Sequence, residues 1–147
     1  CNQGVGVSDP NSRYFIFLHA DTVVIDPAWI DVLVNISESQ GSGVVGTSMQ
    51  HYYIQKQKVD FIQEWCMLVT RECWNDIGPW PEELPIVGMS FIMTLRAQLK
   101  GHKPQATRNN IVHHYRQFSM DPSDFEKMSE KAMGIVARLM QETQQSK

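Results

Sequence analysis

The chain has 147 residues, of which 42% are hydrophobic and 20% charged, and its formal net charge is −3. This length is enough to bury the core of one globular domain. The slightly acidic balance argues against a protein that binds nucleic acid or an anionic membrane surface, and no apolar run approaches the ~20 residues of a transmembrane helix. The sequence also lacks a charged-then-apolar leader, so we expect a cytoplasmic protein.

The three cysteines, Cys1, Cys66 and Cys73, show no Cys-x-x-Cys spacing. A disulfide framework and a structural zinc site both require closer or more regular spacing. We therefore expect three reduced thiols, two of them packing in the core.

The hydrophobic pattern predicts strands and helices in alternation along the chain. Tyr14–Leu18 is a continuous apolar run whose length suits a strand buried on both faces. Further strands are expected over 44–49, 65–69 and 110–114, and 51–58 is either a strand or a surface excursion. Helices are expected over 27–39, 71–77, 89–100 and 121–141. Such alternation is typical of an α/β domain.

Turn and cap residues mark the ends of these helices. Asp26 and Pro27 provide an N-cap and a first helical residue, and Gly78 and Gly101 end two later helices. The last helix carries an apolar stripe that needs a partner, either this domain or a second subunit. The stripe consists of Phe125, Met128, Ala132, Ile135, Val136 and Leu139.

Three polar residues, His19, Asp21 and Thr22, follow the first strand directly. Ligands of open α/β sheets bind beyond the carboxyl ends of strands, and an imidazole and a carboxylate can share a divalent cation. The alternative is that Asp21 and Thr22 only turn the chain. A phosphatase of the haloacid dehalogenase type would need a nucleophilic Asp where His19 stands, so that class is excluded.

Five segments in sequence order resemble motifs of the family 2 glycosyltransferases, which use nucleotide sugars. Together they span most of the chain, from Asn2 to Ser119. They read NQGVGVS, YFIFLHADTVVIDPAWIDVL, VTRECWNDIGPWPEEL, GMSFIMTLRAQLKGHK and IVHHYRQFS. The residues in matching positions are Asn2, Gly4, Asp21, Arg71, Trp74, Ile77, Gly78, Trp80, Glu82, Gly88, Arg96 and Gly101.

This resemblance implies the GT-A fold, an α/β architecture with a mixed sheet flanked by helices. Residues 1–120 would form the core, followed by a C-terminal amphipathic helix over 121–147. The family's first half, two β-α units that hold the nucleobase and ribose, would lie upstream of Asn2, so we expect a fold that is incomplete at the N-terminus. An open sheet edge and the amphipathic helix would both favour a homo-oligomer.

The resemblance also implies a metal-dependent transfer of a sugar from a nucleoside-diphosphate sugar to a carbohydrate or lipid acceptor. Asp21 would ligate Mn²⁺ or Mg²⁺, and His113 would be a further ligand from the late strand. His19 replaces the first Asp of the motif and belongs to the substrate-binding set with Asn2, Gly4 and Trp80. Trp80 is the residue expected to contact the acceptor.

One departure from the family concerns the catalytic base. Met89 and Ser90 occupy the places of the family's Glu-Asp pair, and neither can deprotonate a hydroxyl at neutral pH. Glu82 or Glu83, in the loop before this helix, are the candidate replacements. The alternative function is a non-catalytic binding or assembly module that keeps the GT-A fold and has lost its base.

Overall fold

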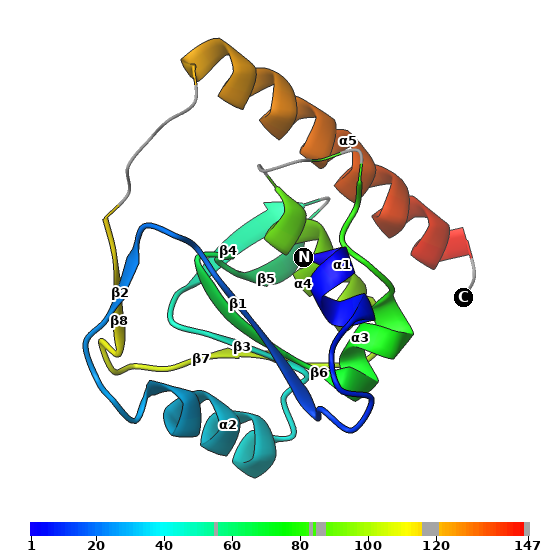
Figure 1. Cartoon of the computed structure of the whole chain (residues 1–147). Coiled ribbons are helices and arrows are strands. Elements are labelled where there is room, and N and C mark those ends of the chain that lie inside the picture. The colour runs from blue at the N-terminus through cyan, green and yellow to red at the C-terminus, as the bar shows by residue number, and fades with distance from the viewer. Residues whose placement is uncertain (55, 83, 85–87, 116–120, 146–147) are drawn as a thin grey trace.

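A computed structural model of the chain describes residues 1–54, 56–82, 84, 88–115 and 121–145. It is a mixed α/β structure in which helices flank a mixed sheet (Figure 1). The elements in chain order are α1 (Asn2–Gly6), β1 (Tyr14–Leu18), β2 (Thr22–Val24), α2 (Trp29–Gln40), β3 (Val44–Gly46), β4 (Met49–Ile54), β5 (Gln57–Ile62), β6 (Cys66–Thr70), α3 (Arg71–Ile77), α4 (Met89–Leu99), β7 (Pro104–Ala106), β8 (Val112–His114) and α5 (Pro122–Gln145).

The main sheet has the strand order β1-β6-β3-β7. β6 runs antiparallel to both β1 and β3, whereas β3 and β7 are parallel. All of β6 from Cys66 to Val69 is fully buried, as its continuous apolar sequence predicts. The register pairs Leu18 with Cys66, so the end of β1 lies beside the segment that enters β6.

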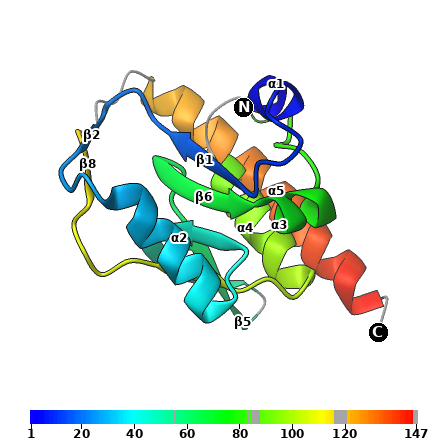
Figure 2. The same ribbon diagram turned by 60° about the horizontal axis from the view of Figure 1, so that its bottom comes forward.

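Helices cover both faces of this sheet. Alternate residues of each strand point to opposite sides, so each face packs its own set of side chains against a helix. On one face, Leu68 and Val45 pack with Leu33 of α2. On the other face, Val69 of β6 packs with Trp74 of α3 and with residues of α4. Figure 2 shows α2 in front of the sheet and α4 and α5 behind it. The core therefore has three layers.

α5 packs against α4, so this domain supplies at least one partner for its apolar stripe. Ala132, Ile135 and Val136 are buried in a cluster with Ile92 and other α4 residues. Phe125, at the start of the predicted stripe, remains 39% exposed. Within the described residues, no helix combines the length and apolar character that crossing a bilayer requires.

Two short antiparallel ribbons extend from the main sheet. β4 and β5 form a hairpin over the region for which the sequence leaves a strand or a surface excursion open. β2 pairs with β8, with Thr22 opposite His114 and Val24 opposite Val112. The β2–β8 ribbon therefore joins the segment after β1 to a strand close to the far end of the chain (Figure 1).

Two local expectations are wrong. β1 lies at an edge of the sheet and is only partly buried, with Leu18 43% exposed, because it has β6 as its one strand partner among the described residues. α2 begins at Trp29 and not at Pro27, because the Asp26 carboxylate accepts a hydrogen bond from the Ala28 N–H at 2.9 Å. Asp26 thus closes a turn before the helix instead of capping it.

The buried cysteines should be chemically inert, which gives a simple test of the core. Burial raises the pKa of the Cys66 thiol to about 11 and that of Cys73 to about 12, whereas Cys1 is exposed. Because the thiolate is the reactive form, a thiol reagent at pH 8 should titrate Cys1 alone in the native chain and all three cysteines after denaturation. Rapid native reaction of a second thiol would contradict the packing around β6 and α3.

Candidate metal centre

Three side chains at the end of β1 and in β8 form a cluster of metal-ligand atoms. His19, Asp21 and His114 each offer one ligand atom, and these atoms lie within 4.8 Å of one another. His114 Nε2 is 3.1 Å from Asp21 Oδ1, and His19 Nδ1 is 3.9 Å from the same oxygen. The side chains are between 19% and 39% exposed, so the cluster is accessible from solvent.

Backbone hydrogen bonds fix the two segments that carry this cluster. The His19 N–H donates to the Trp65 carbonyl at 3.0 Å, and the Tyr115 N–H donates to the Asp21 carbonyl at 3.0 Å. The Thr22 hydroxyl donates to the His19 carbonyl at 2.6 Å. Thr22 therefore turns the chain, while Asp21 keeps its carboxylate on the side of the imidazoles.

Trp65 forms one wall of the cluster. Its indole stacks on the His114 ring with centroids 5.3 Å apart and an interplanar angle of 5°. The indole N–H donates to Gln63 Oε1 at 3.0 Å, which holds the ring plane in place. This contact restrains the imidazole that shares Asp21, because the ring cannot rotate without leaving the indole face.

The structure corrects the assignment of the late-strand histidine. His114, and not His113, points toward Asp21. Successive residues of a strand point to opposite faces, and the pairing of Thr22 with His114 turns His113 away. His113 is exposed and its ring contacts Tyr115 edge-on at 5.1 Å. Of the two histidines, His114 is therefore the one whose ring nitrogen could share a cation with Asp21.

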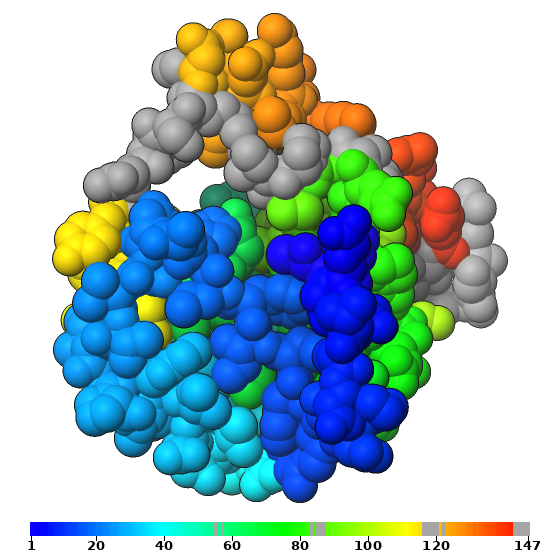
Figure 3. All heavy atoms as spheres, in the orientation of Figure 1, coloured from blue at the N-terminus to red at the C-terminus, as the bar shows by residue number. Residues whose placement is uncertain are grey.

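The predicted substrate-binding residues Asn2, Gly4 and Trp80 lie in or against the N-terminal helix. The Asn2 amide donates to the Trp80 carbonyl at 3.1 Å and accepts from the Trp80 N–H at 2.9 Å. Gly4 is exposed on α1. Figure 3 shows this N-terminal segment lying against the green region that contains α3.

Burial corrects the expectation that Trp80 contacts an acceptor. Only 4% of Trp80 is exposed, and its ring packs edge-on against Phe17 at 5.1 Å. A side chain enclosed in this way has no face to present to a sugar. Trp80 is therefore a core residue, and Asn2 attaches α1 to its backbone.

Of the two candidate bases from the sequence, Glu82 does not join the cluster. Glu82 is exposed and is not one of the grouped ligand residues, and Glu83 lies outside the described residues. A different carboxylate is held near this end of the sheet. Glu64, next to Trp65 in sequence, accepts a hydrogen bond from the Ser90 hydroxyl in the first turn of α4. No spacing in the sequence marks this pair, which is 26 residues apart.

The donor set of the cluster fits a divalent cation. Two imidazole nitrogens and one carboxylate oxygen suit first-row transition metals, because imidazole is a borderline ligand that Mg²⁺ binds poorly. Of the two expected cofactors, this set favours Mn²⁺ over Mg²⁺. Three protein ligands on one side also leave coordination positions for oxygens of a bound molecule.

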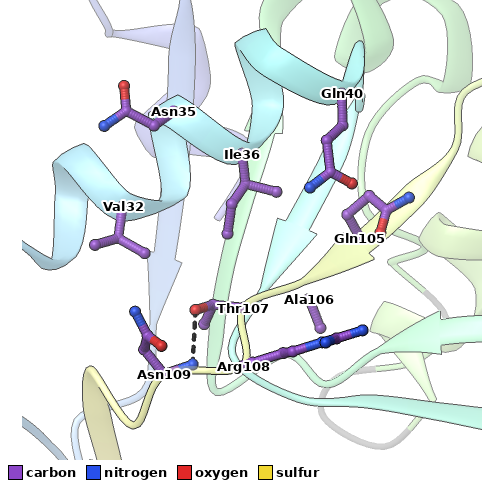
Figure 4. Close-up of a pocket in the computed structure, with 9 residues that line it drawn as sticks. All are labelled: Val32, Asn35, Ile36, Gln40, Gln105, Ala106, Thr107, Arg108 and Asn109. Carbon is purple, nitrogen blue, oxygen red and sulfur yellow. Dashed lines mark hydrogen bonds between the residues drawn. The ribbon is translucent and has the colours of Figure 1, made fainter.

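A separate groove of about 490 Å³ lies between α2 and the segment that contains β7. Figure 4 shows that amide side chains and Arg108 line it, and that the Asn109 N–H donates to Thr107 Oγ1 at 3.0 Å. Its lining comprises Val32, Asn35, Ile36, Gln40, Gln105, Ala106, Thr107, Arg108 and Asn109. The groove shares no residue with the His19–Asp21–His114 cluster.

Comparisons of the chain with protein-family models, with curated proteins and with solved structures gave no match.

Proposed function

We propose that the chain is a metal-dependent glycosyltransferase of the family 2 type with a GT-A-like core. Its reaction is the transfer of a sugar from a nucleoside-diphosphate sugar to an acceptor hydroxyl. The observation that carries this proposal is the cluster of His19, Asp21 and His114 at the carboxyl end of β1. Two of these residues belong to the segment that resembles the family's metal-binding motif.

The chemistry of the reaction explains why such a cluster is useful. The leaving nucleoside diphosphate gains negative charge as the bond from sugar to phosphate breaks. A divalent cation stabilises this charge without supplying a proton. In the proposed site Asp21, His19 and His114 hold the cation, and Trp65 keeps the His114 ring in the orientation that presents Nε2.

Thermal unfolding tests the donor site directly. Mn²⁺ with UDP, GDP or dTDP should stabilise the chain by ~2.7 kcal/mol at a hundredfold excess over Kd. For a chain of this size that is a rise of about 5–10 °C in the unfolding midpoint. The rise should require both metal and nucleotide, and it should disappear in Asp21→Ala.

Asp31→Ala is the matched control, because Asp31 is an exposed carboxylate on α2 outside the cluster. It should keep the full rise in midpoint. If none of the three nucleotides raises the midpoint of the wild type with Mn²⁺, the metal-diphosphate site does not exist. The chain would then be the non-catalytic module that was the alternative interpretation of the sequence.

A further inference from the structure

We propose that Glu64, oriented by Ser90, is the general base that accepts the proton of the attacking hydroxyl; this inference rests on the proposed function. A transfer to a hydroxyl group needs a proton acceptor within hydrogen-bond reach of the attacking oxygen. The sequence alone offers Glu82 and Glu83 for this role. The structure points to a residue from a different element.

The position of Glu64 follows from its neighbours. Trp65 accepts the backbone hydrogen bond of His19 and stacks on His114, and Glu64 is the residue that precedes Trp65 in the chain. Glu64 itself is partly buried, which restricts its side chain and still leaves it accessible. Because the start of β6 pairs with the end of β1, Glu64 lies at the same end of the sheet as the proposed metal ligands, with its carboxylate held on the side of α4.

Ser90 gives this carboxylate a defined orientation. Ser90 is 1% exposed, and its hydroxyl donates to Glu64 Oε2. The N-terminus of α4 favours a negative charge at this point, because its N–H dipoles point outward. Within the described part of the chain the Glu64 carboxylate makes no other hydrogen bond or ion pair, so Oε1 is available to a substrate hydroxyl.

Sugar transfer to a hydroxyl forms one bond at the anomeric carbon and breaks another. The acceptor oxygen forms a bond to the anomeric carbon, and the bond from that carbon to the phosphate oxygen breaks. The electron pair of the broken bond leaves with the nucleoside diphosphate. The hydroxyl proton passes to Glu64 Oε1, and no oxidant or reductant takes part.

The test compares wild type, Glu64→Gln and Glu82→Gln with Mn²⁺ and four donors: UDP-glucose, UDP-N-acetylglucosamine, GDP-mannose and dTDP-glucose. Water serves as the acceptor, and the measurement is the release of nucleoside diphosphate. Glu64→Gln should lower kcat by ~10²- to 10⁴-fold, the range that a positioned base contributes. Glu82→Gln should keep the wild-type rate.

Two further measurements separate chemistry from folding and from metal binding. The glutamine at 64 can still accept the Ser90 hydrogen bond, so Glu64→Gln should keep the unfolding midpoint and its rise with Mn²⁺ and nucleotide. Glu64→Ala should regain at least tenfold in rate when sodium formate supplies a carboxylate in the space left by the side chain. A merely structural role of Glu64 would not give this rescue.

The outcomes distinguish this inference from the proposed function. A Glu64→Gln rate within tenfold of wild type overturns the role of Glu64 and leaves the transferase intact. A wild type that binds Mn²⁺ and nucleotide but releases nothing from any donor also overturns it, because such a chain has no use for a base. Absence of the nucleotide effect in wild type overturns the proposed function, and the role of Glu64 with it.

Discussion

His114→Ala should abolish the stabilisation of the chain by Mn²⁺ and nucleoside diphosphate, whereas His113→Ala should leave it unchanged. The two histidines are adjacent in β8, but only His114 faces Asp21, with Nε2 3.1 Å from Oδ1. Removing a residue that only orients a metal ligand costs 10- to 100-fold in affinity, so losing a ligand should cost at least ~100-fold. The measurement is Mn²⁺ affinity by calorimetry, with the unfolding midpoint as a second reading.

His114→Phe controls for packing in this comparison. A phenyl ring can keep the stacked contact with Trp65 but offers no nitrogen to a cation. It should therefore retain the unfolding midpoint of the ligand-free wild type and lose the metal effect as fully as His114→Ala. Loss of Mn²⁺ affinity in His113→Ala, with retention in His114→Ala, would mean that the strand register between β2 and β8 is wrong.

Gly88→Ala should be among the most destabilising small substitutions in the chain. Gly88 precedes α4 with φ +83°, a left-handed conformation that costs ~1–2 kcal/mol for a residue with a Cβ. A Cβ built there also lies 2.4 Å from the Cβ of Ala132 in α5. Overpacking of this kind adds ~1–3 kcal/mol, so we expect a total loss of ~2–5 kcal/mol in the free energy of unfolding, measured in urea.

Gly41→Ala is the matched control for the backbone term. Gly41 has φ +61° after α2, and a Cβ there meets nothing within 4 Å, so this variant should lose only ~1–2 kcal/mol. Ala132→Gly removes the opposing methyl group, and combining it with Gly88→Ala should recover part of the loss as a coupling energy of ~0.5–3 kcal/mol. Equal effects of Gly41→Ala and Gly88→Ala, without coupling, would refute the contact between α5 and the start of α4.

The elements with strong local signals could be predicted from the sequence. Tyr14–Leu18 and Arg71–Ile77 have the expected bounds, since a continuous apolar run defines the first and Thr70 and Gly78 bracket the second. Thr70 caps this helix through its hydroxyl, which accepts from the Cys73 N–H at 3.1 Å. In contrast, β2 and β7 are three residues each, too short to show any periodicity, and their pairing arises from the tertiary fold.

Only the part of the candidate site that lies on one continuous segment could be predicted from the sequence. His19 and Asp21 follow a recognisable strand, so their place at its carboxyl end could be inferred from sequence. The choice between His113 and His114 could not, because it depends on which residue of β8 pairs with Thr22. Glu64 and Ser90 meet through the packing of α4 beside the entry to β6, and no pattern within either segment indicates that contact.

The β2–β8 ribbon gives the proposed site a kinetic property. Its strands have three residues each, and two-stranded ribbons of this size are marginally stable alone. His19 is anchored to the main sheet through Trp65, while His114 belongs to the ribbon. However, Val112 of β8 is 1% exposed and packs in the cluster with Leu33 of α2, so separating the two imidazoles requires this side chain to leave the core. On the proposed function, escape of a cation and its diphosphate by this route would therefore be slow, because it requires local unfolding of the layer beneath α2.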